Sequence, residues 1–160
     1  MSPNSCGHSR HQPNPGSIWP NCAKRGTAIL IKGILHPEDA ERARQEGADG
    51  IIVSNHGGRQ LDRAVASLDA LPAVRNAVGP DYPVLLDSGV RRGSDIAIGL
   101  CLGADFVFCG RAMLYGAVAH GEQGVRRSIS ILGEELLTVM GQIGATRVAD
   151  LRRELIVAAD

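Results

Sequence analysis

The chain has 160 residues, enough for one domain, and its 44% apolar and 21% charged residues are typical of a globular protein. Its formal net charge of zero argues against nucleic-acid binding, and no apolar run is long enough to span a membrane. The four cysteines form no CxxC pair, which favours reduced thiols in a cytoplasmic protein over a disulfide framework or a metal site.

The N-terminal segment differs in composition from the rest of the chain. Residues 1–26 are rich in Pro, Gly, Ser and Asn and show no apolar periodicity. We expect this segment to be disordered or non-homologous, because it cannot bury enough apolar surface to fold. Residues 27–160 then form the folded part of the chain.

From residue 28 onward, short apolar runs alternate with helical patterns. The apolar runs predict strands at residues 28–31, 50–54, 83–87 and 105–109. The intervening and following segments predict helices at residues 37–45, 72–78, 94–102, 111–119 and 122–140, and a short helix near 148–155. The chain is therefore predicted to contain four consecutive βα units.

The predicted strands are continuous apolar runs, which is typical of a parallel sheet with both faces buried. Two α/β architectures fit this pattern: an open doubly wound sheet and part of a (β/α)8 TIM barrel. A complete barrel needs eight units and about 250 residues, so four units correspond to half of one.

The residues that could take part in binding or catalysis follow the predicted strands. They are Lys32 after the first strand, Ser54, His56 and Arg59 after the second, Asp87, Ser88, Gly89, Val90 and Arg91 after the third, and Gly110 and Arg111 after the fourth. The carboxyl ends of parallel strands form the active face of such folds. We therefore expect these residues to meet at one edge of the sheet.

The loop after the second strand, SNHGGRQLD at residues 54–62, has the most specific pattern. A histidine exchanges protons near neutral pH, and an arginine binds a carboxylate or phosphate with two parallel hydrogen bonds. A solitary histidine after a strand is more often structural. With Arg59 and two glycines beside it, His56 instead indicates chemistry on a small anionic substrate.

The last two strand ends have the composition of a phosphate site. Gly89 and Gly110 allow backbone amides to approach an anion, and Arg111 begins a helix whose first N–H groups have no intrahelical partner. Phosphate sites of TIM barrels frequently follow strands seven and eight. The last two strands of a C-terminal half-barrel occupy those positions.

Four segments together resemble one enzyme family. They are IKGI at residues 31–34, SNHGGRQLD at 54–62, DSGVRRG at 87–93 and GADFVFCGR at 103–111. In this order they resemble the FMN-dependent α-hydroxy acid oxidoreductases, which include glycolate and lactate oxidases, L-lactate dehydrogenases and mandelate dehydrogenase. The resemblance runs from about residue 28 to residue 155 and corresponds to the C-terminal half of that family's TIM barrel.

The resemblance implies an enzyme that uses FMN to oxidise an (S)-2-hydroxy acid to the 2-oxo acid. His56 resembles the active-site base, and Arg59 resembles the residue that binds the substrate carboxylate beside it. Lys32 resembles the lysine at the flavin N1/O2 edge, and Ser54 resembles a residue in contact with the isoalloxazine ring. The ribityl and phosphate contacts correspond to Asp87, Ser88, Gly89, Val90, Arg91, Gly110 and Arg111. Ser88 stands where many relatives have glycine.

The family's tyrosines, a second arginine and the aspartate that pairs with the base belong to the first half of its barrel. We therefore expect the isolated chain to be a truncated fragment with little or no turnover. The implied partners are a 2-hydroxy acid and an electron acceptor (oxygen, a quinone or a cytochrome). We expect a homo-oligomer in the cytoplasm, with peripheral membrane association in full-length relatives.

Two other functions fit parts of the sequence. One is a non-catalytic half-barrel that binds FMN or phosphate and pairs with a second copy or with a complementary half. The other is a different phosphate-binding barrel enzyme, against which the loop of His56 and Arg59 argues, because a phosphate site alone does not require it.

Overall fold

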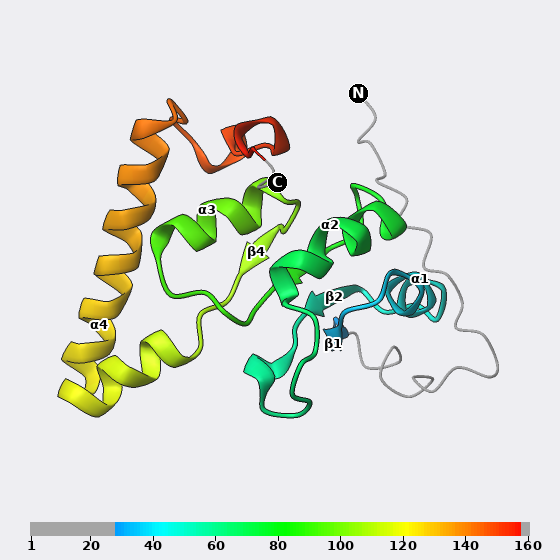
Figure 1. Cartoon of the computed structure of the whole chain (residues 1–160), viewed down its shortest axis with the longest axis horizontal. Helices are drawn as coiled ribbons and strands as arrows, with labels where there is room; N and C mark the ends of the chain where they lie inside the picture. The colour runs from blue at the N-terminus through cyan, green and yellow to red at the C-terminus, as the bar shows by residue number, and fades with distance from the viewer. Residues whose placement is uncertain (1–27, 158–160) are drawn as a thin grey trace, which may run out of the picture.

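Four parallel strands form one sheet whose order follows the chain (Figure 1). The computed structural model describes residues 28–157, so the segment predicted to be disordered lies outside the described residues. The strands are β1 (Leu30–Ile34), β2 (Gly50–Val53), β3 (Val84–Leu86) and β4 (Phe106–Val107). They pair in the order β1-β2-β3-β4. A doubly wound sheet reverses its strand order partway, so the chain adopts the half-barrel alternative.

The helices alternate with the strands. They are α1 (Pro37–Gln45), α2 (Ser67–Val78), α3 (Gly93–Cys101) and α4 (Arg111–Gln142), with 3-10 turns η2 (His56–Gly58), η3 (Val148–Asp150) and η4 (Arg153–Leu155). The predicted helix at residues 37–45 is confirmed at both ends, and the one predicted at 94–102 begins one residue earlier. None of the described helices combines the length and the hydropathy needed to cross a bilayer.

Lys32 lies inside β1, so the prediction that it follows the first strand is wrong. The strand continues through Gly33, whose φ of +95° would ordinarily interrupt it. Pairing with β2 accommodates the glycine through a register shift between Lys32 and Ile34. The irregular backbone therefore falls beside the lysine, at the carboxyl end of β1.

The predicted start of the second helix, at Pro72, is also wrong. Helix α2 begins at Ser67 and contains Pro72 in its interior. An interior proline removes one backbone hydrogen bond and costs a helix about 3 kcal/mol. Burial of Ala70, Leu71 and Val74 against the sheet offsets this cost, which local sequence preference does not reveal.

The two helices predicted at residues 111–119 and 122–140 are the two arms of α4. The arms meet at His120 and Gly121, whose backbone dihedral angles are not helical. The second arm leaves the kink in a different direction and packs against α3 (Figure 1). Gly116 and Gly124 lie where the arms touch, and a Cβ atom on Gly124 would overlap the carbonyl group of Gly116.

One face of the sheet forms the main core with α1 and α2. Its strand residues and the helical residues packed on them are almost completely buried: Ile51, Val53, Val84, Leu86, Ala40, Ala43, Leu71 and Val74. A second, smaller cluster joins α3 to the second arm of α4 and to the segment after it. Both clusters hold the helices on the outer side of the sheet.

The opposite face of the sheet is open, so the prediction that both faces are buried is wrong. Lys32, Ile52, Leu85 and Phe106 pair side by side across all four strands on this face. The side chain of Phe106 is 54% exposed, and that of Leu30 on the same face is 43% exposed. In a closed barrel this face points inward and is covered by the remaining strands. The exposed face of these four strands therefore has the apolar composition of a barrel interior, but no described residues cover it.

Arg75 connects the outer helices to the sheet through one largely buried guanidinium group. It donates hydrogen bonds to the carbonyl oxygens of Gly103 (2.7 Å), Gly79 (2.9 Å) and Tyr82 (2.7 Å). It also pairs with the carboxylate of Asp105 at 2.6 Å. The Arg75 side chain is only 13% exposed. If the guanidinium group were removed, water could not readily replace it as the donor to these oxygens.

We predict that Arg75→Met lowers the free energy of unfolding by about 3 kcal/mol, because buried carbonyl groups lose their donor. The measurement is urea denaturation followed by circular dichroism. Arg126→Met is the matched control, since Arg126 pairs only with exposed Glu122 on its own helix. Equal unfolding midpoints for the two variants would contradict the prediction.

Candidate functional site

A cavity of about 710 Å³ opens at the carboxyl end of the sheet. Ten of the eleven residues predicted to form the site line it: Lys32, His56, Arg59, Asp87, Ser88, Gly89, Val90, Arg91, Gly110 and Arg111. The eleventh, Ser54, lies fully buried at the end of β2 and bonds to the lysine. All four strand ends contribute to this cavity, and the roles of the individual residues stay predictions.

The ammonium group of Lys32 is the centre of the polar network. Its Nζ lies 2.9 Å from Oδ2 of Asp87 and donates to Oγ of Ser54 at 2.8 Å. The same atom lies 3.4 Å from Nδ1 of His56. One side chain from β1 therefore joins the loops that follow β2 and β3.

Asp87 is held in its charged form by this network. Its partial burial would raise the pKa, but hydrogen bonds from Ser54, Lys32 and Ser88 and the positive charge of Lys32 outweigh burial and lower the pKa. The resulting carboxylate gives the lysine a fixed counter-charge within the cavity.

The backbone of the histidine loop is strained. His56, Gly57 and Gly58 have φ values of +54°, +68° and +75°, so three successive residues are left-handed. Glycine adopts this conformation without penalty, whereas a histidine there costs about 1–3 kcal/mol. The side chain of Asn55 stabilises the turn by accepting from the Gly57 N–H at 2.9 Å, which accounts for the residue types Asn-His-Gly-Gly.

Gly33 makes room for the imidazole ring of His56. A Cβ atom at this position would lie 2.8 Å from Nε2 of His56, and the φ of +95° independently favours glycine. Sequence analysis did not assign Gly33 to the site. The signal that could have found it is a glycine directly after a lysine at a strand's carboxyl end.

The other end of the cavity is strongly cationic. Arg91 and Arg111 line it together with Gly89 and Gly110. Helix α4 begins at Arg111, and no side chain caps its N-terminus. The free N–H groups of a helix start and two guanidinium groups suit a phosphate monoester.

Arg111 also reaches the histidine loop. Its NH2 group donates to the Gly57 carbonyl oxygen at 3.3 Å, and a Cβ atom on Gly57 would lie 2.9 Å from that group. The absence of a side chain at Gly57 therefore leaves room for the Arg111 guanidinium group. The arginine connects the cationic end of the cavity to the backbone of the histidine loop.

Apolar side chains that sequence analysis missed complete the cavity. They are Ile52, Phe108 and Leu114, with Cys109 beside them. Burial raises the pKa of the Cys109 thiol, which keeps it neutral. Ile52 could have been found from strand alternation, because it lies on the same face as Lys32. An apolar wall beside cationic groups suits a flat ring system that carries a phosphate.

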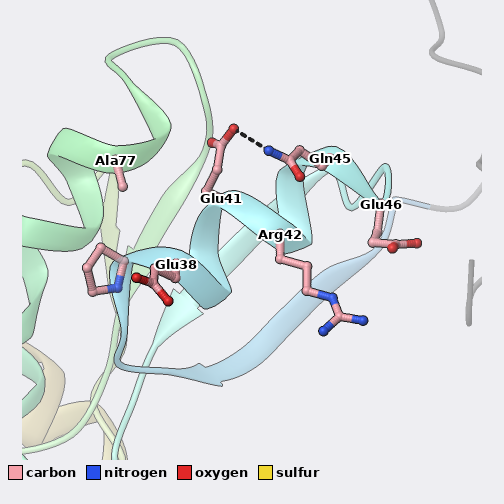
Figure 2. A pocket seen from close by; sticks show the side chains of 7 residues that line it. Glu38, Glu41, Arg42, Gln45, Glu46 and Ala77 are labelled. Atoms are coloured by element: carbon pink, nitrogen blue, oxygen red, sulfur yellow. Dashed lines mark hydrogen bonds between the residues drawn. The ribbon is translucent and has the colours of Figure 1, made fainter.

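A separate hollow of about 450 Å³ lies between α1 and Ala77 of α2 (Figure 2). Glu38, Glu41 and Glu46 line it, and none of the predicted site residues does. Glu41 already accepts hydrogen bonds from Arg44 and Gln45. The hollow lies away from the carboxyl ends of the strands and is not part of the candidate site.

Four parallel βα units with a cationic cavity at their carboxyl ends define half of a TIM barrel whose cavity suits a phosphate-bearing cofactor. The sequence model of the FMN-dependent dehydrogenase family matches residues 15–158, and the chain belongs to that family. The cofactor of this family is FMN, and the donors at the cationic end of the cavity fit its phosphate.

Relatives are similar over most of this chain. It is 51% identical over 132 residues to an L-lactate oxidase of Lysinibacillus sphaericus, with 82% of this chain and 34% of that protein covered. An L-lactate oxidase of Alicycliphilus denitrificans is 46% identical, with 94% and 41% covered. The chain therefore spans between a third and two fifths of the length of these relatives.

Solved structures show the same fold. The monotopic membrane protein (S)-mandelate dehydrogenase aligns with a TM-score of 0.79 and 45% identity, over 82% of this chain and 35% of that one. A mandelate oxidase in complex with (S)-2-phenylpropionate aligns with a TM-score of 0.79 and 42% identity, over 82% and 40%. The sheet described above is thus the corresponding part of a TIM-barrel flavoenzyme.

The lowered pKa of Asp87 predicts a pH dependence of stability. Because the folded pKa lies below the ordinary value of 3.8, the ionised carboxylate stabilises the fold above that pH. This stabilisation is lost as the pH falls through the folded pKa. We predict that Asp87→Asn weakens the acid dependence of the unfolding free energy, measured by urea denaturation at pH values from about 6 down to about 2.

Asp81→Asn is the control, because Asp81 is an exposed carboxylate outside the cavity. Its curve should run parallel to that of the unmodified chain. If the Asp87→Asn curve is parallel too, the network does not hold the carboxylate in its charged form.

Proposed function

We propose that this chain supplies the base, the carboxylate-binding arginine and the cofactor site for FMN-dependent oxidation of an (S)-2-hydroxy acid to the 2-oxo acid. The observation that supports it is that His56, Arg59 and Lys32 share one cavity with the cationic phosphate end. Relatives named L-lactate oxidase and (S)-mandelate dehydrogenase support a 2-hydroxy acid as the substrate class.

At the substrate end, Arg59 pairs with the carboxylate of the acid and fixes its orientation. His56 is the base, which takes a proton from the α-carbon or the hydroxyl group of the acid. The two residues belong to one loop, so the orientation of the acid and the position of the base are set together.

At the cofactor end, Arg91, Arg111 and the N-terminus of α4 hold the phosphate. Lys32 would place its positive charge beside the isoalloxazine ring, where it would stabilise negative charge. Ser54 is fully buried, so it would act through its hydrogen bond to Lys32 and not by contact with the ring. The loop from Asp87 to Arg91 binds the ribityl chain. When bound, FMN accepts the two electrons that the acid loses.

The isolated chain should turn over slowly. Within residues 28–157, no carboxylate pairs with His56, and the atom nearest to its Nδ1 in the network is the ammonium nitrogen of Lys32. The imidazolium that forms when the base takes a proton therefore lacks a stabilising negative charge. Steady-state rates normal for the family, in a chain of these 160 residues, would overturn this proposal.

We predict that the purified chain binds FMN and that an (S)-2-hydroxy acid reduces it in a single anaerobic turnover. His56→Ala should slow reduction by about 100-fold or more and leave FMN affinity unchanged, because it removes only the base. Flavin absorbance measures reduction, and the quenching of flavin fluorescence measures binding. L-lactate and (S)-mandelate are the acids to compare.

Arg59→Lys is the companion variant. It keeps the charge but loses the two parallel hydrogen bonds, so the acid concentration for half-maximal reduction should rise about 10-fold. His120→Ala, at a histidine of α4 that does not line the cavity, is the matched control and should behave as the unmodified chain. Reduction that is unaffected by His56→Ala would refute the catalytic assignment.

A second candidate function, assembly of a half-barrel without turnover, is favoured by the open face of the sheet. Two copies related by a two-fold axis would place β4 of one beside β1 of the other and close eight parallel strands. The exposed Leu30 and Phe106 would then lie inside the closed barrel. We propose that a second copy of the chain covers this face.

Light scattering at micromolar concentration should therefore give twice the mass of the chain. Phe106→Glu should shift the equilibrium to the monomer, because it places a charge inside the closed barrel. Val118→Glu is the control, since Val118 is 87% exposed on α4 away from the open face. A monomeric chain, or one that assembles only with a complementary half, would exclude the second copy.

The identity of the acid and of the acceptor (oxygen, a quinone or a cytochrome) stays a prediction at the level of chemical class. A cytoplasmic location and peripheral membrane association of longer relatives also stay predictions from sequence.

A further inference from the structure

Ser88 is the third described residue with a left-handed backbone that is not glycine, alongside His56 and Arg63. Its φ is +78°, a conformation in which a side chain is unfavourable. Glycine would be the least strained residue here. The serine side chain must therefore be justified by its contacts.

The hydroxyl group of Ser88 lies between two loops of the site. It donates to Oδ1 of Asp87 at 2.7 Å and accepts from the N–H of Gly57 at 3.1 Å. It also lies 3.4 Å from Oγ of Ser54. The loop after β3 is thereby attached to the loop after β2 at the residue that follows His56.

The direction of these hydrogen bonds is set by the charge of Asp87. A carboxylate only accepts, so the single hydroxyl proton of Ser88 must point toward it. The hydroxyl oxygen then turns a lone pair toward the Gly57 N–H. The pKa of Asp87 is lowered by the same network, so this orientation holds at neutral pH.

The Gly57 N–H belongs to the strained part of the histidine loop. It is shared between Oδ1 of Asn55 at 2.9 Å and Oγ of Ser88 at 3.1 Å. The Asn55 contact is local and would form in any such turn. The Ser88 contact, by comparison, attaches the turn to the loop that follows β3.

We propose that Ser88 is a positioning residue: its hydroxyl group transmits the fixed geometry of the Lys32–Asp87 pair to the backbone of His56 and so orients the base. This rests on the function proposed above for His56. Ser88 does not touch the reacting atoms in this proposal. It determines where the imidazole stands relative to the cavity.

Two variants separate the hydroxyl group from the backbone conformation. Ser88→Ala removes the hydroxyl and keeps the strain of a left-handed side chain. Ser88→Gly removes the hydroxyl and relieves the strain. If the hydroxyl positions the loop, both variants should be impaired; if only backbone conformation matters, the glycine variant should equal or exceed the unmodified chain.

The first readout is hydrogen exchange of the Gly57 amide in the full chain, followed by NMR. Loss of one hydrogen bond should accelerate exchange by about 5- to 10-fold in both variants. The Val74 amide in α2 should keep its exchange rate, which shows that the change is local and not global unfolding. Ser130→Ala is the matched control, because the hydroxyl of Ser130 bonds only within α4, to the Arg126 carbonyl.

The second readout is single-turnover flavin reduction by an (S)-2-hydroxy acid. Both variants should reduce flavin about 10-fold more slowly when both the acid and FMN are saturating, so that any change in FMN affinity does not enter the rate. A loss that appears only in FMN affinity would make Ser88 a cofactor contact and overturn the proposal.

The two readouts keep this proposal distinct from the proposed function. If no hydroxy acid reduces the flavin of the unmodified chain, the function fails, but Gly57 exchange still decides whether Ser88 holds the loop. Unchanged exchange in both variants, or normal behaviour of Ser88→Gly, would refute the positioning role.

Discussion

The ion pair between Lys32 and Asp87 is the interaction on which the candidate site depends. The lysine belongs to β1 and the aspartate follows β3, so the pair spans the strand between them, where the buried Ser54 bonds to the same ammonium group. In a parallel sheet, strand ends are joined only by backbone pairing further back, and the loops beyond them have no inherent relation. This pair fixes the ends of the strands relative to one another. Hydrogen bonds from Asp87 through Ser88 to the Gly57 N–H extend this fixed arrangement to the backbone beside His56.

The sheet assigns different tasks to its two faces. The outer face builds a core with α1 and α2 from the described residues alone, so these four βα units have a defined structure. The inner face carries Lys32 in line with Ile52, Leu85 and Phe106. Lys32 and the exposed apolar side chains therefore lie on the same face of the sheet. Any partner that covers this face would also shield the lysine from water.

Sequence alone predicted ten residues that the structure brings together around one cavity, because most of them follow strand ends, where a local pattern is enough. It also located α1 correctly, since Pro37 and its acidic first turn are local signals. It failed where contacts distant in sequence decide: the start of α2 before Pro72, the clearance that Gly33 gives the His56 ring, and the continuation of β1 through Lys32. It could not show that the inner face is open, because the strands have the apolar sequences of a complete barrel whether or not other strands cover that face.

The contact between the arms of α4 has a consequence for how the chain tolerates substitution. Gly116 and Gly124 meet backbone to backbone, so neither position has room for a methyl group. Neither residue faces the sheet, and neither lines the cavity. Selection should nevertheless preserve both glycines as a pair, because the first arm carries Arg111 toward the cavity while the second is anchored on α3. The close contact of these two glycines thus helps to determine where Arg111 lies at the cavity.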